Sequence, residues 1–104
     1  MARLDVYANP DKTERAHTPY FVDVQNDHID GIDSRVVIPL RSEAMFGPRA
    51  RKLHPLLNVS GKAVVLDTAA IGAVPVGTLR PPVGDLRAAR AEVQEALDAL
   101  FGAY

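Results

Sequence analysis

The segment Tyr20–Gln25, which reads YFVDVQ, carries the clearest β-strand pattern of the chain. Even-numbered and odd-numbered side chains of a strand lie on opposite faces, so one face of this strand holds a tyrosine and two valines. The segment Arg35–Leu40, which reads RVVIPL, is rich in β-branched residues and predicts a second strand. Because proline lacks a backbone N–H, Pro39 predicts that this second strand lies at a sheet edge or ends in a bulge there.

Shorter segments on either side of this pair also predict strands, each bounded by turn residues. The tripeptide Ser60-Gly61-Lys62 predicts a hairpin turn between two of them, and Pro75 restricts another to a sheet edge. These additional strands are Arg3–Tyr7, Leu56–Val59, Ala63–Leu66 and Ala73–Val76. Such a succession of short strands predicts a strongly bent antiparallel sheet or an SH3-like small barrel.

The chain changes character after Pro82 and predicts a helix over residues 86–101. Asp85 is placed to cap the first turn, and Gly102 is placed to end the helix. Apolar residues recur at helical spacing and would pack on the sheet as one stripe; they are Leu86, Val93, Leu97, Leu100 and Phe101. The predicted fold is therefore mainly β with one C-terminal α-helix, in a single domain over residues 1–104.

The composition is that of an ordinary water-soluble domain. Of the 104 residues, 47% are hydrophobic and 24% are charged, and the net charge is −1. This near neutrality argues against a surface built throughout to hold nucleic acid. The absence of cysteine excludes a disulfide framework and a thiolate zinc site. No apolar run reaches about 18 residues, so we expect a cytoplasmic protein that does not enter the membrane.

Residues typical of catalytic or metal sites are few and scattered. No histidine follows a ligand spacing, no serine lies in a nucleophile-elbow motif, and the aspartates around Gly31 lack the pattern of a calcium loop. The residues concerned are His17, His28, His54, Ser34, Ser42, Ser60, Asp27, Asp30 and Asp33. We therefore expect no catalytic residue, no metal and no cofactor.

Two stretches are candidate contact surfaces. Between Arg41 and His54 the basic residues outnumber the single acidic residue, Glu43. This stretch could hold nucleic-acid phosphates, or it could be a solvated loop or short helix. Beyond the predicted helix the sequence reaches an aromatic residue, Tyr104. A terminal aromatic side chain is an efficient contact group, and a frayed tail is the other interpretation.

Several short motifs follow one another in a recognisable order. They are Tyr20–Asp27, Ile29–Asp30, Val36–Leu40, Leu53–Pro55, Ala70–Val76, Asp85–Leu86 and Leu100–Phe101. In this order they resemble the CcdB family of toxins, collinearly from about Leu4 to Phe101. The phrase FVDVQ followed by VIPL is the most specific part of the resemblance.

The resemblance implies a homodimer with a bent antiparallel sheet, a small accessory sheet and one C-terminal helix. Family members bind the A subunit of DNA gyrase and trap the enzyme with its DNA cleaved, without catalysis of their own. A partly disordered antitoxin, CcdA, removes them from gyrase, and the two together bind operator DNA and repress their operon. An extended antitoxin needs an exposed sheet edge or groove, and the edges at Pro39 and Pro75 and the loop 9–18 are candidates.

The gyrase contact of the family is a tail that reads Phe-Trp-Gly-Ile. The corresponding residues here are Phe101, Gly102, Ala103 and Tyr104, and the chain has no tryptophan. Loss of a buried aromatic anchor typically costs about 2 kcal/mol or more in binding. One alternative is therefore an attenuated or retargeted member of the family that does not poison gyrase.

A second alternative comes from a different functional class. The MazF and Kid toxins are similar in fold and cleave mRNA with basic and acidic side chains on the sheet. In that case Arg35, Arg49, Arg51 and His54 would bind phosphate and transfer protons.

Overall fold

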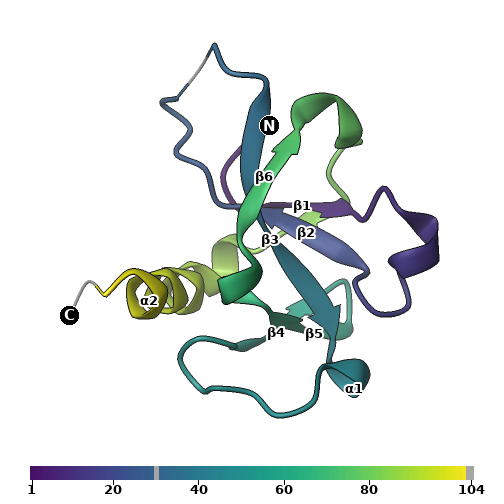
Figure 1. Ribbon diagram of the computed structural model, residues 1–104, viewed down its shortest axis with the longest axis vertical. Helices are drawn as coiled ribbons and strands as arrows, with labels where there is room; N and C mark the ends of the chain where they lie inside the picture. The colour runs from purple at the N-terminus through teal and green to yellow at the C-terminus, as the bar shows by residue number, and fades with distance from the viewer. Residues whose placement is uncertain (30, 103–104) are drawn as a thin grey trace.

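The computed structural model describes residues 1–29 and 31–102 (Figure 1). The strands are β1 (Asp5–Ala8), β2 (Tyr20–Asp23), β3 (Ser34–Ser42), β4 (Leu56–Val59), β5 (Lys62–Leu66), β6 (Gly72–Pro75) and β7 (Gly84–Asp85). The helices are α1 (Glu43–Phe46) and α2 (Arg90–Phe101), and 3-10 turns lie at η1 (Lys12–Glu14), η2 (Thr68–Ala70), η3 (Val76–Thr78) and η4 (Arg87–Ala89). The predicted fold class, mainly β with a C-terminal helix, is confirmed.

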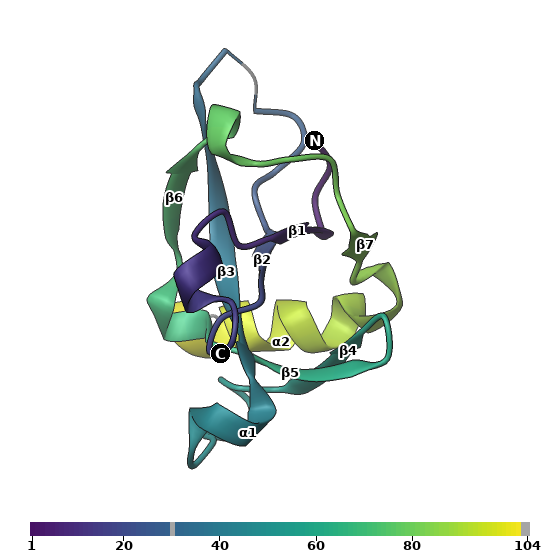
Figure 2. The same cartoon turned by 90° about the vertical axis from the view of Figure 1, so that its right-hand side faces the viewer.

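The sheet curls until its two ends approach each other, which makes it a nearly closed barrel (Figure 2). Its strand order is β4-β5-β3-β2-β1-β7, with β6 paired to β3 beside this path, and the paired strands are antiparallel. Although β4 and β7 stand at opposite ends of this order, they approach each other in space. A Cβ atom on Gly84 would lie 3.9 Å from Cγ1 of Val59.

One face of the sheet forms the main hydrophobic core together with α2. Val6, Val22 and Ile38 are neighbours in the register of β1, β2 and β3, and their side chains are fully buried. The helix lies across this face (Figure 2) and contributes Val93 and Ala96 to the same core. Removal of this apolar surface from water is the main stabilising contribution to such a fold.

The opposite face of the sheet carries a smaller core. Tyr7 and Val37 are odd-numbered residues of β1 and β3, and they are buried together with Leu79 from the segment after η3. Tyr7 is only 1% exposed, and its hydroxyl has no hydrogen-bond partner among the described residues. Burial, followed by the nearby charges of Asp5 and Asp23, raises the pKa of this hydroxyl.

The position of β3 shows that the prediction for Pro39 is wrong. β3 is a central strand, with β2 on one side and β6 followed by β5 on the other. The Pro39 carbonyl accepts a hydrogen bond from the Asp67 N–H at 3.0 Å, so Pro39 faces the junction between β6 and β5. At this junction no partner strand requires a hydrogen bond from the backbone nitrogen of residue 39. β6, which carries Pro75, pairs only with β3 among the described strands and is an edge, as predicted.

Two turn predictions are confirmed, and the first turn of the predicted C-terminal helix is a 3-10 turn. Ser60 and Gly61 have φ values of 51° and 83°, as a tight turn between β4 and β5 requires. Gly102 ends α2 with a φ of 74°. The α-helix begins at Arg90 rather than at residue 86, because residues 87–89 form the 3-10 turn η4 directly before it. The Asp85 carboxylate accepts the Arg87 N–H at 2.9 Å, ahead of this turn.

Candidate functional site

The C-terminal end of α2 projects from the body of the protein (Figure 1). Phe101, the last helical residue, is 69% exposed, although its spacing predicts a place on the buried stripe. The Gly102 N–H donates to the Asp98 carbonyl at 2.9 Å and closes the helix. Ala103 and Tyr104, the other two residues predicted to contact gyrase, lie outside the described residues. The described part of the tail therefore presents one large aromatic side chain to solvent.

An apolar groove of about 390 Å³ begins at Phe101 and runs between α2 and the loop after β2. Its rim includes Ile29, which is 46% exposed. The lining residues are Val24, Gln25, Asn26, Ile29, Val36, Ile71, Gln94, Leu97, Asp98 and Phe101. A concave apolar surface with exposed apolar residues at its rim is typical of a contact site for another protein.

Sequence reasoning missed this groove because its residues come from distant segments. Ile29 belongs to the loop between β2 and β3, Ile71 follows η2, and Leu97 lies on α2. The local signal is Ile29, an apolar residue in the largely polar loop between β2 and β3.

The residues expected to form an endoribonuclease site are not brought together. The Arg35 guanidinium lies at the start of β3, where it donates to the Asp23 carboxylate at 2.7 and 3.0 Å. Arg49, Arg51 and His54 belong to the loop between α1 and β4, past the other end of this nine-residue strand. A strand of that length separates the two groups by roughly 20 Å. The arrangement gives no support to acid–base chemistry by this set.

His54 holds its loop in place. Its Nδ1 accepts the Ala50 N–H at 3.0 Å, and the Phe46 ring packs edge-on against the imidazole with a centroid distance of 4.9 Å. Its Nε2 lies 3.7 Å from the Asp67 carboxylate, which also pairs with Arg41 at 3.0 Å. These contacts anchor the segment after α1 to the end of β3.

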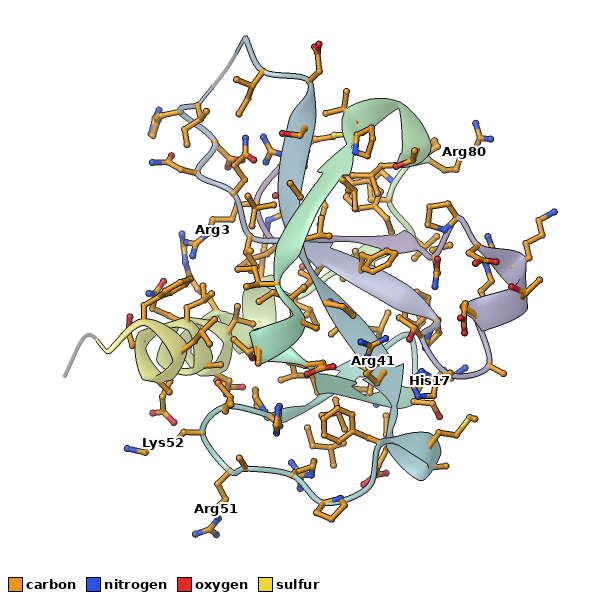
Figure 3. The ribbon with its side chains drawn as sticks, viewed as in Figure 1. Arg3, His17, Arg41, Arg51, Lys52 and Arg80 are labelled. Carbon is orange, nitrogen blue, oxygen red and sulfur yellow. The ribbon has the colours of Figure 1, made fainter. Side chains whose placement is uncertain are left out.

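The basic stretch between residues 41 and 54 does not form one continuous surface. Arg41 lies beside His17 where the loop 9–18 meets β3 (Figure 3), and both contact the Thr18 hydroxyl, at 2.6 and 3.1 Å. Arg51 and Lys52 extend outward from the loop ahead of β4 (Figure 3). The stretch is therefore a short helix followed by a solvated loop, and the alternative of one phosphate-binding face is not supported.

Among the described residues, the histidines and acidic side chains do not gather at one place. In residues 1–29 and 31–102 there is no cluster of three or more side chains with metal-ligating groups. Asp27 accepts the Arg3 N–H at 2.8 Å and lies 3.5 Å from the Arg35 guanidinium, and Asp30 lies outside the described residues. No helix in this part of the chain has the length and apolar character needed to cross a membrane.

The fold and the site define a small barrel-like β protein with an exposed aromatic side chain at the end of its C-terminal helix. The family described as CcdB protein matches the chain over residues 3–102. The chain therefore belongs to the CcdB family, and the resemblance seen in the sequence is confirmed. Membership of this family makes it a toxin of a toxin–antitoxin system.

Proposed function

We propose that this toxin binds the A subunit of DNA gyrase through the end of α2 and traps the enzyme while its DNA is cleaved. The observation that supports the proposal is Phe101, which is 69% exposed at the rim of the apolar groove. A projecting aromatic side chain beside apolar surface is the usual anchor of a protein–protein contact. The toxin acts by binding, and its own side chains break no bond.

The absence of tryptophan changes which residue is the anchor. Gly102 has the left-handed backbone conformation that favours glycine, so the helix ends directly after Phe101. In this proposal Phe101 takes the role of the aromatic anchor, and Tyr104 is the second aromatic group of the tail. Gly102 and Ala103 complete the contact.

The toxin is proposed to act in the cytoplasm as a homodimer, which presents the end of α2 twice. A CcdA-like antitoxin neutralises it, and operator DNA is bound only by the two together. The candidate edge at Pro39 drops out, because β3 is paired on both sides. The edge of β6 at Pro75 and a cavity of about 450 Å³ beside the loop 9–18 are the surfaces offered to the antitoxin.

A gyrase cleavage assay tests the proposal. Purified toxin is incubated with gyrase from the same organism and plasmid DNA, and linear DNA is measured after detergent and protease treatment. We expect linear DNA to accumulate with the unaltered toxin. Phe101→Ala should be at least about thirtyfold less potent, the factor that corresponds to about 2 kcal/mol of lost anchor energy. A chain that ends at Phe101 should be inactive.

The matched control is Met45→Ala, which removes another exposed apolar side chain, 53% exposed on α1. This variant should cleave like the unaltered toxin. Full activity of a folded Phe101→Ala protein would contradict the role of the tail. Absence of cleavage by folded, dimeric, unaltered toxin would favour an attenuated or retargeted member of the family, for which the missing tryptophan is the specific reason.

A further inference from the structure

A larger concave surface, about 700 Å³, lies where α2 begins. We call it the basic cavity; its lining residues are Arg3, Leu4, Val24, Asn26, Asp27, His28, Arg87 and Arg90. Val24 and Asn26 line both this cavity and the groove at Phe101. Arg90 and Phe101, the first and last residues of α2, lie roughly 17 Å apart along the helix. The family tail and the basic cavity are therefore different surfaces.

Arg3 is oriented by uncharged acceptors. Its Nε donates to the Val24 carbonyl and its Nη2 donates to Oε1 of Gln94, both at 3.2 Å. These bonds fix the guanidinium without neutralising it. A guanidinium carries five N–H donors, so several of them stay available to a ligand.

Arg90 supplies a second cation to the same cavity from the first residue of α2. In the described part of the chain, neither Arg3 nor Arg90 has an acidic partner within ion-pair distance. Two guanidinium groups therefore line one cavity with their charges uncompensated by those residues.

The remaining charges of the cavity are already paired. Arg87 lies 3.0 Å from the Asp5 carboxylate and 3.4 Å from that of Asp85, and it also donates to the Arg3 carbonyl at 3.3 Å. It therefore braces the wall rather than offering a free cation. The Asp27 carboxylate accepts the Arg3 N–H and lies 3.5 Å from the Arg35 guanidinium, which partly balances its charge.

We propose that the basic cavity binds the phosphate group of a nucleotide-sized ligand, with Arg3 and Arg90 as the groups that contact the phosphate oxygens. Charge-assisted hydrogen bonds from arginine suit phosphate oxygens in both geometry and strength. The volume lies within the range of small-ligand sites, about 300–1,000 Å³. Leu4 and Val24, 3% and 9% exposed, form part of the cavity floor, and His28 is a further lining residue. This site goes beyond the proposed action on gyrase.

The test is an NMR titration of the full-length, ¹⁵N-labelled toxin with adenosine monophosphate and, separately, with inorganic phosphate. We expect adenosine monophosphate to shift the amides of Arg3, His28 and Arg90, and inorganic phosphate to compete for the same amides. Arg90→Ala and Arg3→Gln should each weaken binding at least tenfold. Arg80→Ala removes an exposed arginine on the opposite side of the molecule (Figure 3) and should bind within twofold of the unaltered toxin.

A third arm uses a short DNA duplex at the same salt concentration. Shifts of the same amides that disappear in Arg90→Ala would support the phosphate site and identify the nucleic-acid backbone as its natural source. No shift at these amides with millimolar adenosine monophosphate would overturn the proposal. Equal weakening by Arg80→Ala would also overturn it, because it would show attraction by overall charge alone. Each variant is checked for an unchanged amide spectrum away from the substituted residue.

Discussion

Arg35 and Asp23 form a buried, two-point ion pair that links β3 to β2. Nε of Arg35 lies 2.7 Å from Oδ2 of Asp23, and Nη2 lies 3.0 Å from Oδ1. The Asp23 side chain is 0% exposed and that of Arg35 is 9% exposed. The hydrogen bond from Arg35 to Asp23 is the main cause that raises the pKa of Arg35. The pair lies on the sheet face that also carries Tyr7.

Arg35→Ala is expected to lower the free energy of unfolding by about 3 kcal/mol, because it leaves the Asp23 carboxylate buried without its charged partner. Urea denaturation followed by circular dichroism measures this change. Arg80→Ala, which removes an exposed arginine, should change the same quantity by no more than about 0.5 kcal/mol. A loss below about 1 kcal/mol in Arg35→Ala would show that water reaches Asp23.

Tyr7→Phe is expected to stabilise the protein by about 1 kcal/mol. The Tyr7 hydroxyl is buried and has no hydrogen-bond partner among the described residues, so its removal relieves an unfavourable desolvation. The free energy of unfolding from urea denaturation at pH 7 is the measurement. A clear loss of stability would mean that the hydroxyl has a partner in solution.

The raised pKa of Tyr7 predicts that the protein loses stability at alkaline pH. The pKa of Tyr7 in the folded protein is raised, first by burial and then by Asp5 and Asp23, above the value of about 10 in the unfolded chain. The folded state therefore keeps a proton that the unfolded state loses. This contribution is complete below pH 10 and is lost as the pH rises through the folded pKa. The free energy of unfolding, measured from pH 8 to pH 11, should fall less steeply in Tyr7→Phe.

Gly102→Ala is expected to lower the free energy of unfolding by about 1 kcal/mol. Gly102 has a φ of 74°, and the space that a Cβ atom would enter is open, so the cost arises from backbone conformation alone. Gly77 provides the control, since its surroundings are equally open and its φ lies outside the left-handed region. Thermal unfolding of the two alanine variants should show a lower midpoint for Gly102→Ala only. Equal midpoints would mean that the end of α2 unwinds without cost.

Phe101→Ala should weaken binding to gyrase while leaving the stability of the fold almost unchanged. Phe101 is 69% exposed, so its removal should change the free energy of unfolding by less than about 0.5 kcal/mol. Leu97 lies on the same helix and is only 9% exposed, so Leu97→Ala should lower the free energy of unfolding by about 2 kcal/mol or more. Urea denaturation of both variants gives this comparison. A large loss in Phe101→Ala would place that ring in a packed interface.

Much of the fold follows from local sequence patterns. The alternation around Val22 and Ile38 predicts two strands because one face of each is buried, and Ser60-Gly61 predicts a turn because of its backbone requirements. The prediction for Pro39 was wrong because proline is compatible with any position whose backbone nitrogen needs no partner. The junction between two partner strands is such a position, as is a sheet edge. Leu4 takes a φ of 74°, which no local rule predicts for leucine; its backbone bonds to Asp23 and Leu86 hold it there.

The candidate sites also differ in how far they could be predicted from local sequence. Helical spacing placed Phe101 on the buried stripe, and only the resemblance to the CcdB family indicated it as a contact residue; the structure shows it 69% exposed. The apolar groove and the basic cavity could not be predicted, because each joins residues such as Arg3 and Arg90 that meet only through tertiary packing. The residues of the endoribonuclease hypothesis, in contrast, do not meet in the folded chain, because Arg35 and His54 lie at opposite ends of β3.

The near closure of the barrel also bears on aggregation. An unpaired strand edge can recruit another polypeptide and start the growth of an intermolecular sheet. Here β4 and β7 face each other across the gap at Gly84 and Val59, and β7 is only two residues long. The edge of β6 has four residues and includes Pro75, which cannot donate to an added strand. The folded toxin thus offers little template for self-association into fibres.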